Sequence, residues 1–393
     1  MFIGIDLGTS SVKMIIVDYD QNILATADSP VSVQNPKDGY SEQNPEEWIN
    51  ATLECLEVLK SKKPKEFMET IAIGISGQMH GATLIDSSGE VIRPCILWND
   101  TRSYKECEEF ENQNIDVRSI SGNITMPGFT APKINWLKNN EIESFKKIHK
   151  VLLPKDYLRF YLTGDYYSEM SDASGTLWLD VKDRKWSEKL LSCSELDLKH
   201  MPTLVEGNQE TGTLKNNIKD KFGFNNNVLV VGGAGDQAAA AAGMGIINQK
   251  QSFISLGTSG VFFTPTQNFL SNTRNAVHSF CHCLPDKWHL MSVMLSASNC
   301  LDWICTITNT SIADTLKNVE NYFNDPSLVS NSSFFLPYLS GERTPHNDPH
   351  IRGSFHAIKT TTDATNMQYA VIEGVSFGIL DGVNSILKVN DNF

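Results

Sequence analysis

The sequence is short of positive charge, of long apolar runs and of any cysteine framework. Its 393 residues include 33 Lys and Arg against 46 Asp and Glu, which gives a formal net charge of -13. Nucleic-acid backbones and anionic membranes are held mainly by Lys and Arg, so this balance argues against both as partners. It leaves small phosphorylated ligands open, because backbone amides and metal ions can hold these locally.

No apolar run approaches the roughly 20 residues that a membrane span requires. The chain opens on a strand-like segment without a cationic leader, and its cysteines are scattered along the sequence. We therefore expect a cytoplasmic protein with free thiols and no membrane partner. Cys281, His282 and Cys283 lie together, but their segment alternates like a strand and lacks a second ligand pair, so we expect no zinc there.

Strand-like and helix-like segments alternate along the chain, which indicates the α/β class. Apolar runs predict strands at 2–7, 12–18, 71–75, 82–85 and 228–231. Helical spacing of apolar residues predicts a helix over 46–60, and the Ala-rich segment 237–242 predicts another directly after a Gly-rich loop.

A short motif occurs twice and indicates how the chain is organised. Asp6–Lys13 and Ser255–Phe262 share Leu, Gly, Thr, Ser and Val at equal offsets, and each joins two strand-like runs. Two copies in equivalent contexts predict two domains of common design that face each other across a cleft. We place the boundary near residue 247, with a first domain over 1–246 and a second over 247–393.

Each copy of the motif predicts a hairpin turn suited to phosphate groups. Gly8 and Gly257 lack a Cβ, so backbone N–H groups can approach an anion closely, and neighbouring hydroxyls add donors. Asp6 stands before the first turn, where a carboxylate could hold Mg²⁺. Ordinary hairpins without a ligand are the alternative. The residues expected at a polyphosphate are Asp6, Gly8, Thr9, Ser10, Lys13, Gly257, Thr258 and Ser259.

Asp236 is the candidate catalytic base. It follows the Gly-rich loop 232–235 and opens the Ala-rich helix, a position where ligands approach in α/β sheets. A helix N-cap is the alternative, and the two roles are compatible. The positive helix end would keep the carboxylate ionised with a low pKa. In a loose phosphoryl-transfer transition state it would orient a hydroxyl and take the proton late.

Two loops offer polar groups to a sugar. Residues 76–81 contain Gln78 and His80, and residues 98–100 place Asn99 and Asp100 beside a tryptophan. Fixed hydrogen-bonding groups next to an apolar ring are typical of polyol sites. A structural histidine and a simple turn after a strand are the alternatives on the pattern alone.

These segments resemble the FGGY family of carbohydrate kinases, and within it the xylulose-phosphorylating members. The resemblance extends to about residue 385 and is carried by residues 1–10, 76–81, 96–100, 128–133, 153–157, 171–176, 277–281, 290–296 and 339–346. It implies two actin-like (RNase H-like) ATPase domains flanking a cleft, and ATP-dependent phosphorylation of D-xylulose to D-xylulose 5-phosphate. It also implies that ATP and Mg²⁺ bind, with Asp236 as the base, Met79 and His80 as sugar contacts, and Asp6 near the metal and phosphates.

The sequence departs from the family pattern at two places. Ala357 stands where a glycine is usual, and no Gly-rich turn follows the helix expected around 366–388. The family continues there with an adenosine-binding motif, so we expect a second domain that is incomplete. The alternatives are a kinase for another ketose or polyol, or an inactive sugar-binding remnant. The sequence leaves a homodimer open.

Overall fold

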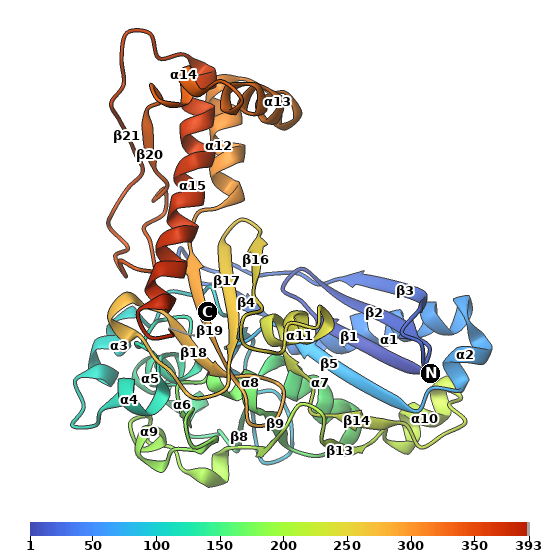
Figure 1. Ribbon diagram of the computed structural model, residues 1–393. Helices are drawn as coiled ribbons and strands as arrows, with labels where there is room; N and C mark the ends of the chain where they lie inside the picture. Colours follow the sequence, from blue (N-terminus) through green and yellow to red (C-terminus); the bar gives the residue numbers. More distant parts are fainter. Residues whose placement is uncertain (391–393) are drawn as a thin grey trace. The chain divides into compact units, whose positions relative to one another are not determined.

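The structure is a computed structural model that describes residues 1–390. The chain divides into two compact units, one made of residues 1–247 with 280–287 and the other of the remaining residues. Both units combine sheets with helices, which confirms the α/β class (Figure 1). The predicted strands and helices are also confirmed, with ends that differ from the predicted ones by no more than two residues.

The first unit is built on a seven-stranded sheet. The strands along its main path are β13 (Glu210–Thr213), β14 (Leu229–Val231), β5 (Ala72–Gly77), β1 (Phe2–Leu7), β2 (Ser11–Val17) and β3 (Ile23–Pro30), in that spatial order. The short strand β15 (Ala234–Gly235) also pairs with β5. Strands β1, β2 and β3 form antiparallel hairpins, whereas β1 and β14 run parallel to β5.

Alternation along β1 separates a core face from an open face. Ile3, Ile5 and Leu7 are buried, while Asp6 on the opposite face is exposed. The core face packs against apolar side chains of the helices α1 (Pro45–Lys62), α7 (Pro154–Thr163) and α10 (Asn216–Phe222). Since side chains of a strand alternate between faces, the register that buries these apolar residues places Asp6 on the open face.

Local signals fix helix α1 at its start. Pro45 occupies the first turn, and the Asn44 side chain accepts a hydrogen bond from the Glu46 N–H at 3.1 Å. Glu46 and Glu47 lie at the positive end, and Lys60 lies in the last turn, as the helix dipole favours. Trp48 and Leu59 on the inner side are fully buried.

The remaining elements of the first unit are short. The helices are α2 (Pro64–Met68), α3 (Tyr104–Glu111), α4 (Val117–Ser121), α5 (Thr130–Asn140), α6 (Ile142–Phe145), α8 (Met170–Ser174), α9 (Glu188–Ser192), α11 (Asp236–Gly243) and the 3₁₀ helix η1 (Leu198–His200). The strands are β4 (Glu42–Gln43), β6 (Thr83–Ile85), β7 (Cys95–Ile96), β8 (Lys150–Leu152), β9 (Tyr167–Glu169), β10 (Leu179–Asp180), β11 (Lys185–Trp186) and β12 (Thr203–Val205).

The second unit contains a four-stranded sheet and a group of helices. The sheet runs in the order β16 (Phe253–Leu256), β17 (Gly260–Thr266), β19 (Trp288–Met294) and β18 (His278–Cys281), and the last two residues of β18 count with the first unit. The other elements are η2 (Thr273–Asn275), α12 (Ser298–Thr308), α13 (Ile312–Phe323), α14 (Pro326–Val329), β20 (Phe334–Leu336), β21 (Ser354–His356) and α15 (Ala364–Leu387). Ala370 and Val371 of α15 are buried against Cys300, Ile304 and Phe335.

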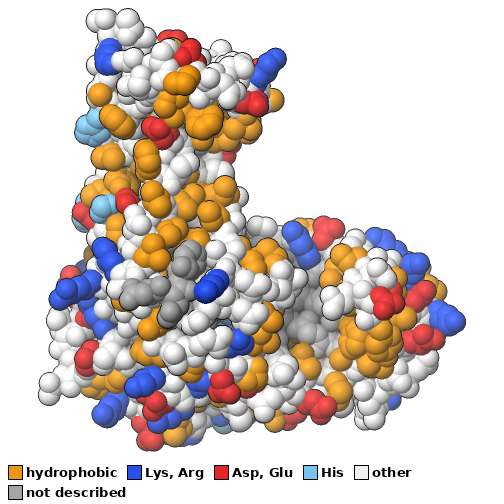
Figure 2. Space-filling view, in the orientation of Figure 1, with side chains coloured by type: hydrophobic (Ala, Val, Ile, Leu, Met, Phe, Trp, Pro, Cys, Tyr) orange, Lys and Arg blue, Asp and Glu red, His pale blue; other side chains and the backbone are white. Residues whose placement is uncertain are grey.

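Helix α15 corrects the expectation that no segment reaches the length of a membrane span. Its length and composition would allow it to cross a membrane. About a third of its most apolar 18-residue segment is buried inside the structure. Core helices of proteins without a membrane pass the same test, so this is weak evidence for a span. Figure 2 shows hydrophobic side chains gathered over the second unit, where Leu316, Phe323 and Phe377 are exposed.

A pair of isoleucine substitutions tests the two faces of the first sheet. Ile3→Ala should lower the free energy of unfolding by about 2–5 kcal/mol, because it opens a cavity in the core. Ile23→Ala in β3 should change it by no more than about 0.5 kcal/mol, since Ile23 is 62% exposed. Urea unfolding of both variants measures the difference, and equal losses would contradict the described core.

Candidate active site

The first predicted phosphate turn is a tight hairpin turn between β1 and β2. The Gly8 N–H donates to the Ser11 carbonyl oxygen at 3.0 Å, and Asp6 lies opposite Lys13 in the strand register. The Asp6 carboxylate accepts a hydrogen bond from the Ser76 hydroxyl of β5 at 2.6 Å. Asp6, Ser10 and Lys13 are exposed at this turn. The turn therefore offers a carboxylate, an ammonium group and hydroxyls to a ligand, and its contact with phosphates stays a prediction.

The second turn joins β16 to β17 within the second unit. The Gly257 N–H donates to the Ser259 carbonyl oxygen at 3.0 Å, and the Ser298 hydroxyl donates to the Gly257 carbonyl oxygen at 2.6 Å. Gly257 and Thr258 are exposed. The predicted hairpin is confirmed, while the role of Gly257, Thr258 and Ser259 in binding phosphate stays a prediction.

Asp236 lies at the carboxyl end of the sheet, where β15 leads into α11. It is the first residue of α11, and its carboxylate accepts a hydrogen bond from the Gln237 N–H at 2.7 Å. Gly235 is the N-cap, so the expectation of an Asp236 N-cap is wrong by one position. Asp236 has solvent-exposed surface. The protein packed around its carboxyl nevertheless desolvates the charged form and raises its pKa to about 6, and the charge of Asp6 raises the pKa further. The expected low pKa is therefore wrong, because desolvation and repulsion outweigh the helix end.

The carboxylates of Asp6 and Asp236 suit a hard cation. They lie near enough for the charge of Asp6 to raise the pKa of Asp236. Mg²⁺ takes oxygen ligands and is usually bound by one or two carboxylates together with substrate phosphates. Within residues 1–390, no cluster of three or more His, Cys, Asp or Glu side chains could hold a metal by itself. The donor set therefore fits an ion that arrives with phosphate groups.

The loop that follows β5 places Met79 next to Gly235, the residue before Asp236. Strand β15 pairs with the end of β5, with Gly235 opposite Gly77. A Cβ on Gly235 would lie 3.0 Å from the Met79 thioether sulfur, so glycine allows this close approach. Met79 is buried, and His80 is partly buried. Met79, one of the predicted sugar contacts, thus lies beside the residue that precedes the predicted base.

His80 is held on several sides. Its Nδ1 lies 2.7 Å from the Gly175 carbonyl oxygen, and because a carbonyl can only accept, Nδ1 donates in this hydrogen bond. Thr130 and Lys133 donate to the His80 carbonyl oxygen at 3.0 Å and 2.9 Å. The backbone of His80 has a φ of 68°, a conformation that favours glycine. A strained residue held by so many contacts is typical of a functional site.

Gln78 connects the hairpin to this loop. Its Oε1 accepts from the Thr9 hydroxyl at 3.1 Å, and its Nε2 donates to the Gln43 side chain at 2.8 Å. The Trp98 indole N–H also donates to the Thr9 hydroxyl, at 3.0 Å. Gln78 is only 4% exposed. The structure therefore gives Gln78 a connecting role between the Thr9 turn and the His80 loop.

Sequence comparison decides the family. Models of the N-terminal and C-terminal domains of the FGGY family of carbohydrate kinases match residues 1–243 and 252–390. The chain belongs to the FGGY family of carbohydrate kinases. The fold of such kinases, with two α/β domains of actin-like type, is therefore its fold.

Individual relatives are similar over nearly the whole chain. It is 45% identical to the xylulose kinase of Escherichia coli (strain K12) and 44% identical to that of Klebsiella pneumoniae, covering 98% of this chain and 78% and 79% of those proteins. A crystal structure of a "xyloylose kinase" from Brucella ovis has a TM-score of 0.95 and 46% identity over 99% of this chain and 79% of that one. The family's C-terminal domain model matches the chain from residue 252 to residue 390.

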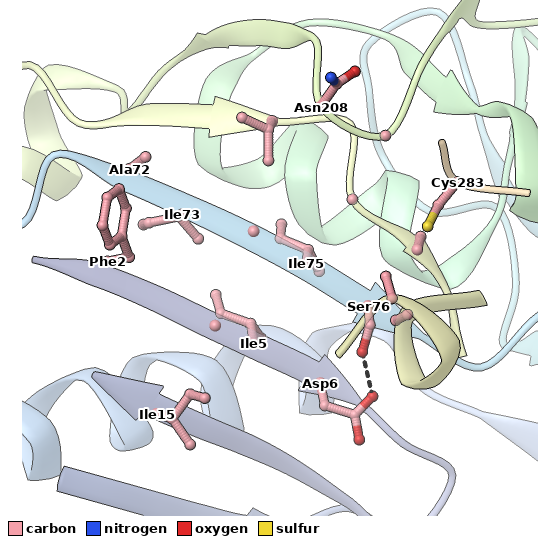
Figure 3. A pocket seen from close by; sticks show the side chains of 18 of the residues that line it. Phe2, Ile5, Asp6, Ile15, Ala72, Ile73, Ile75, Ser76, Asn208 and Cys283 are labelled. Atoms are coloured by element: carbon pink, nitrogen blue, oxygen red, sulfur yellow. Dashed lines mark hydrogen bonds between the residues drawn. The ribbon is translucent and has the colours of Figure 1, made fainter. Parts of the chain in front are cut away.

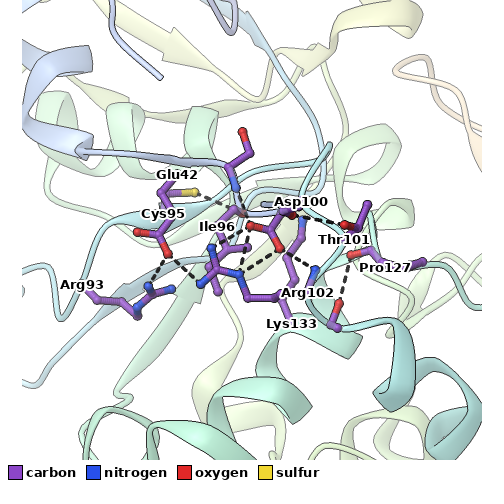
Figure 4. Close-up of polar contacts among 12 residues, drawn as sticks. Glu42, Arg93, Cys95, Ile96, Asp100, Thr101, Arg102, Pro127 and Lys133 are labelled. Atoms are coloured by element: carbon purple, nitrogen blue, oxygen red, sulfur yellow. Dashed lines mark hydrogen bonds and ion pairs between the residues drawn. The ribbon is translucent and has the colours of Figure 1, made fainter. Parts of the chain in front are cut away.

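Asp100 corrects the prediction of a sugar contact. Both of its carboxylate oxygens bond the Arg102 side chain, at 2.7–3.0 Å, and one accepts from the Ser41 N–H at 2.6 Å. Arg102 is also 2.7 Å from Glu42, so the guanidinium lies between two carboxylates (Figure 4). Asp100 is 1% exposed. Its oxygens are thus engaged in a buried ion pair, while the neighbouring Asn99 is exposed.

Two features of the structure were not predicted from the sequence. One is a groove of about 710 Å³ on the open face of the first sheet, with Asp6 and Ser76 at one end (Figure 3). Small residues at Gly4, Ala72 and Gly74 line it, and their alternation along two strands was the available signal. The other is a buried charged group, which includes Lys155, Glu169 and Asp172, behind the Gly-rich loop.

Adjacent substitutions test the role of Asp100. Asp100→Asn should lower the free energy of unfolding by about 3–5 kcal/mol, because it leaves the buried Arg102 charge without its main partner. Asn99→Ala should change it by no more than about 0.5 kcal/mol. Thermal or urea unfolding measures both. An Asp100→Asn variant of normal stability with a raised sugar KM would restore the sugar-contact role.

Proposed function

We propose that the chain transfers the γ-phosphoryl group of MgATP to D-xylulose and forms D-xylulose 5-phosphate. The observation that carries this proposal is the position of Asp236, which lies at a sheet end near Asp6 and directly follows Gly235, the residue that Met79 approaches. Its support from comparison is the identity of 45% over 98% of the chain with a protein named xylulose kinase. As in other carbohydrate kinases, the donor would be ATP and the acceptor a small sugar.

In this proposal Asp236 acts on the sugar hydroxyl. The ionised carboxylate accepts a hydrogen bond from that hydroxyl and orients its oxygen toward the γ-phosphorus. The new O–P bond forms as the bond to the ADP oxygen breaks, and the hydroxyl proton passes to Asp236 late in this step. His80 forms a hydrogen bond with the sugar, and Met79 makes an apolar contact with the sugar.

The remaining assignments concern the phosphates. Mg²⁺, when bound, would neutralise charge on the phosphate oxygens, with Asp6 as its protein partner directly or through water. We assign phosphate contacts to the first turn (Gly8, Thr9, Ser10 and Lys13) and to the second (Gly257, Thr258 and Ser259).

The domain division and the location are also part of the proposal. Residues 1–246 form the domain that holds the sugar and the base, and residues 247–393 form the second kinase domain. The proposed location of the protein is the cytoplasm.

The test is a phosphorylation assay with D-xylulose and MgATP, with Asp236→Asn as the deciding variant. The substitution keeps the shape of the side chain and removes the proton acceptor, so kcat should fall by about 10²–10⁴-fold. Xylulose binding measured by calorimetry and the Tm should change little. Near-normal kcat in Asp236→Asn would refute the base assignment.

The choice of sugar is tested separately. If another ketose or polyol shows a much higher kcat/KM than D-xylulose, the reaction class stands and the substrate assignment is wrong. Sugar binding without any product would instead support a binding protein.

The pH dependence gives a second test of Asp236. Burial raises its pKa to about 6, so the carboxylate is ionised above this pH and protonated below it. Only the ionised form can accept the proton. We therefore expect kcat/KM to fall about tenfold for each pH unit below roughly 6. Measuring the rate between pH 5 and 8 checks this, and an acid limb centred near 4 would contradict the raised pKa.

A further inference from the structure

The proposed base stands at the end of a loop that has little stiffness of its own. Residues 232–235 are Gly-Gly-Ala-Gly, and Gly233 has a φ of +77°. A Cβ on Gly233 would collide with the Ile75 carbonyl oxygen. Glycines let the chain make this close approach, but they also leave its backbone free to move. Other contacts must therefore fix where the loop delivers the Asp236 carboxylate.

A buried serine holds the end of the loop next to Asp236. The Gly235 N–H donates to the Ser171 hydroxyl oxygen at 3.0 Å. That hydroxyl donates its only hydrogen to a Glu169 carboxylate oxygen at 2.7 Å, and the other Glu169 oxygen accepts the Ser171 N–H at 2.7 Å. Because the hydrogen is directed to Glu169, a lone pair of the hydroxyl faces Gly235. Glu169 and Ser171 are fully buried, so water cannot replace this contact.

A buried lysine contacts the start of the same loop. Lys155 donates to the Gly232 carbonyl oxygen at 3.4 Å, and its ammonium lies 3.0 Å from Asp156 and 3.5 Å from Asp172. Burial alone would lower the pKa of Lys155, but the surrounding carboxylates outweigh this and raise it. The lysine is thus a fixed cation, and the loop is held at Gly232 as well as at Gly235.

We propose that Ser171, oriented by Glu169, is a positioning residue for Asp236. It fixes the Gly235 amide, and through it the first residue of α11, so that the carboxylate meets the sugar hydroxyl in a reactive geometry. This inference rests on the proposed function of Asp236 as the base. Misplacing a reacting group by about 1 Å can cost on the order of 100-fold in rate. Loss of the Ser171 contact should therefore act on kcat more than on binding.

The same helix offers a closely matched control. Ser174, also on α8, is fully buried like Ser171, and its hydroxyl accepts a backbone N–H at the same distance, 3.0 Å, from Cys281. It also donates to the Met170 carbonyl oxygen at 2.8 Å. Ser171→Ala and Ser174→Ala therefore remove equal groups from one buried helix. Only the first removes a contact to the loop before Asp236.

The experiment compares kcat, the sugar KM and Tm of both variants with those of the unchanged chain. Ser171→Ala should lower kcat about 10- to 100-fold with little change in the sugar KM. The two variants should lower Tm by similar amounts. Ser174→Ala should have a much smaller effect on kcat than Ser171→Ala. Equal kcat in the two variants would overturn the proposal, because Ser171 would then contribute only to stability.

Hydrogen exchange gives a readout that does not depend on activity. The Gly235 amide should exchange on the order of tenfold faster in Ser171→Ala and at its usual rate in Ser174→Ala. Unchanged exchange in Ser171→Ala would also overturn the proposal. If the alanine variant fails to fold, Ser171→Cys and Ser174→Cys, which keep a weaker acceptor, carry the same comparison. Normal kcat in Asp236→Asn refutes the proposed function instead, so the two failures can be told apart.

Discussion

The parallel pairing of β5 with its neighbours is the constraint on which the site depends. Asp6 of β1 lies opposite Ser76 of β5, and Gly235 of β15 lies opposite Gly77. Three segments that are far apart in sequence therefore end at one edge of the sheet. This register sets the positions of the Asp6 carboxylate, of the loop with Met79 and His80, and of Asp236. A shift of one residue in any of these strands would turn the side chains to the other face.

Close approach at that edge requires residues without side chains. A Cβ on Gly235 would lie 3.0 Å from the Met79 sulfur, and a Cβ on Gly175 would lie 2.6 Å from His80 Nδ1 and 3.0 Å from Met79. A larger residue at either position would displace the Met79 and His80 side chains. Desolvation by the surrounding protein raises the pKa of Asp236, although the hydrogen bond from the Gln237 N–H at the helix start lowers it.

Buried charges support the site from behind. Lys155, Glu169 and Asp172 are fully buried, and burial raises the pKa of Asp172 against the opposing effect of Lys155. Apolar residues of the same volume could fill this space with similar or greater stability. The charged residues instead give directional contacts. Lys155 donates to Gly232, and Glu169 accepts from the Ser171 hydroxyl, which in turn accepts from the Gly235 N–H.

The sequence by itself determined the α/β class, the main strands and helices, and the two Gly-Thr-Ser hairpins, because periodicity and turn residues act locally. Only the tertiary structure decided the surroundings of these residues. It placed Asp100 in an ion pair with Arg102, used Gln78 to connect two loops, and made Asp236 the first residue of its helix with a raised pKa. Burial, desolvation and contacts between distant segments arise only when the chain is packed, so no local pattern could show them.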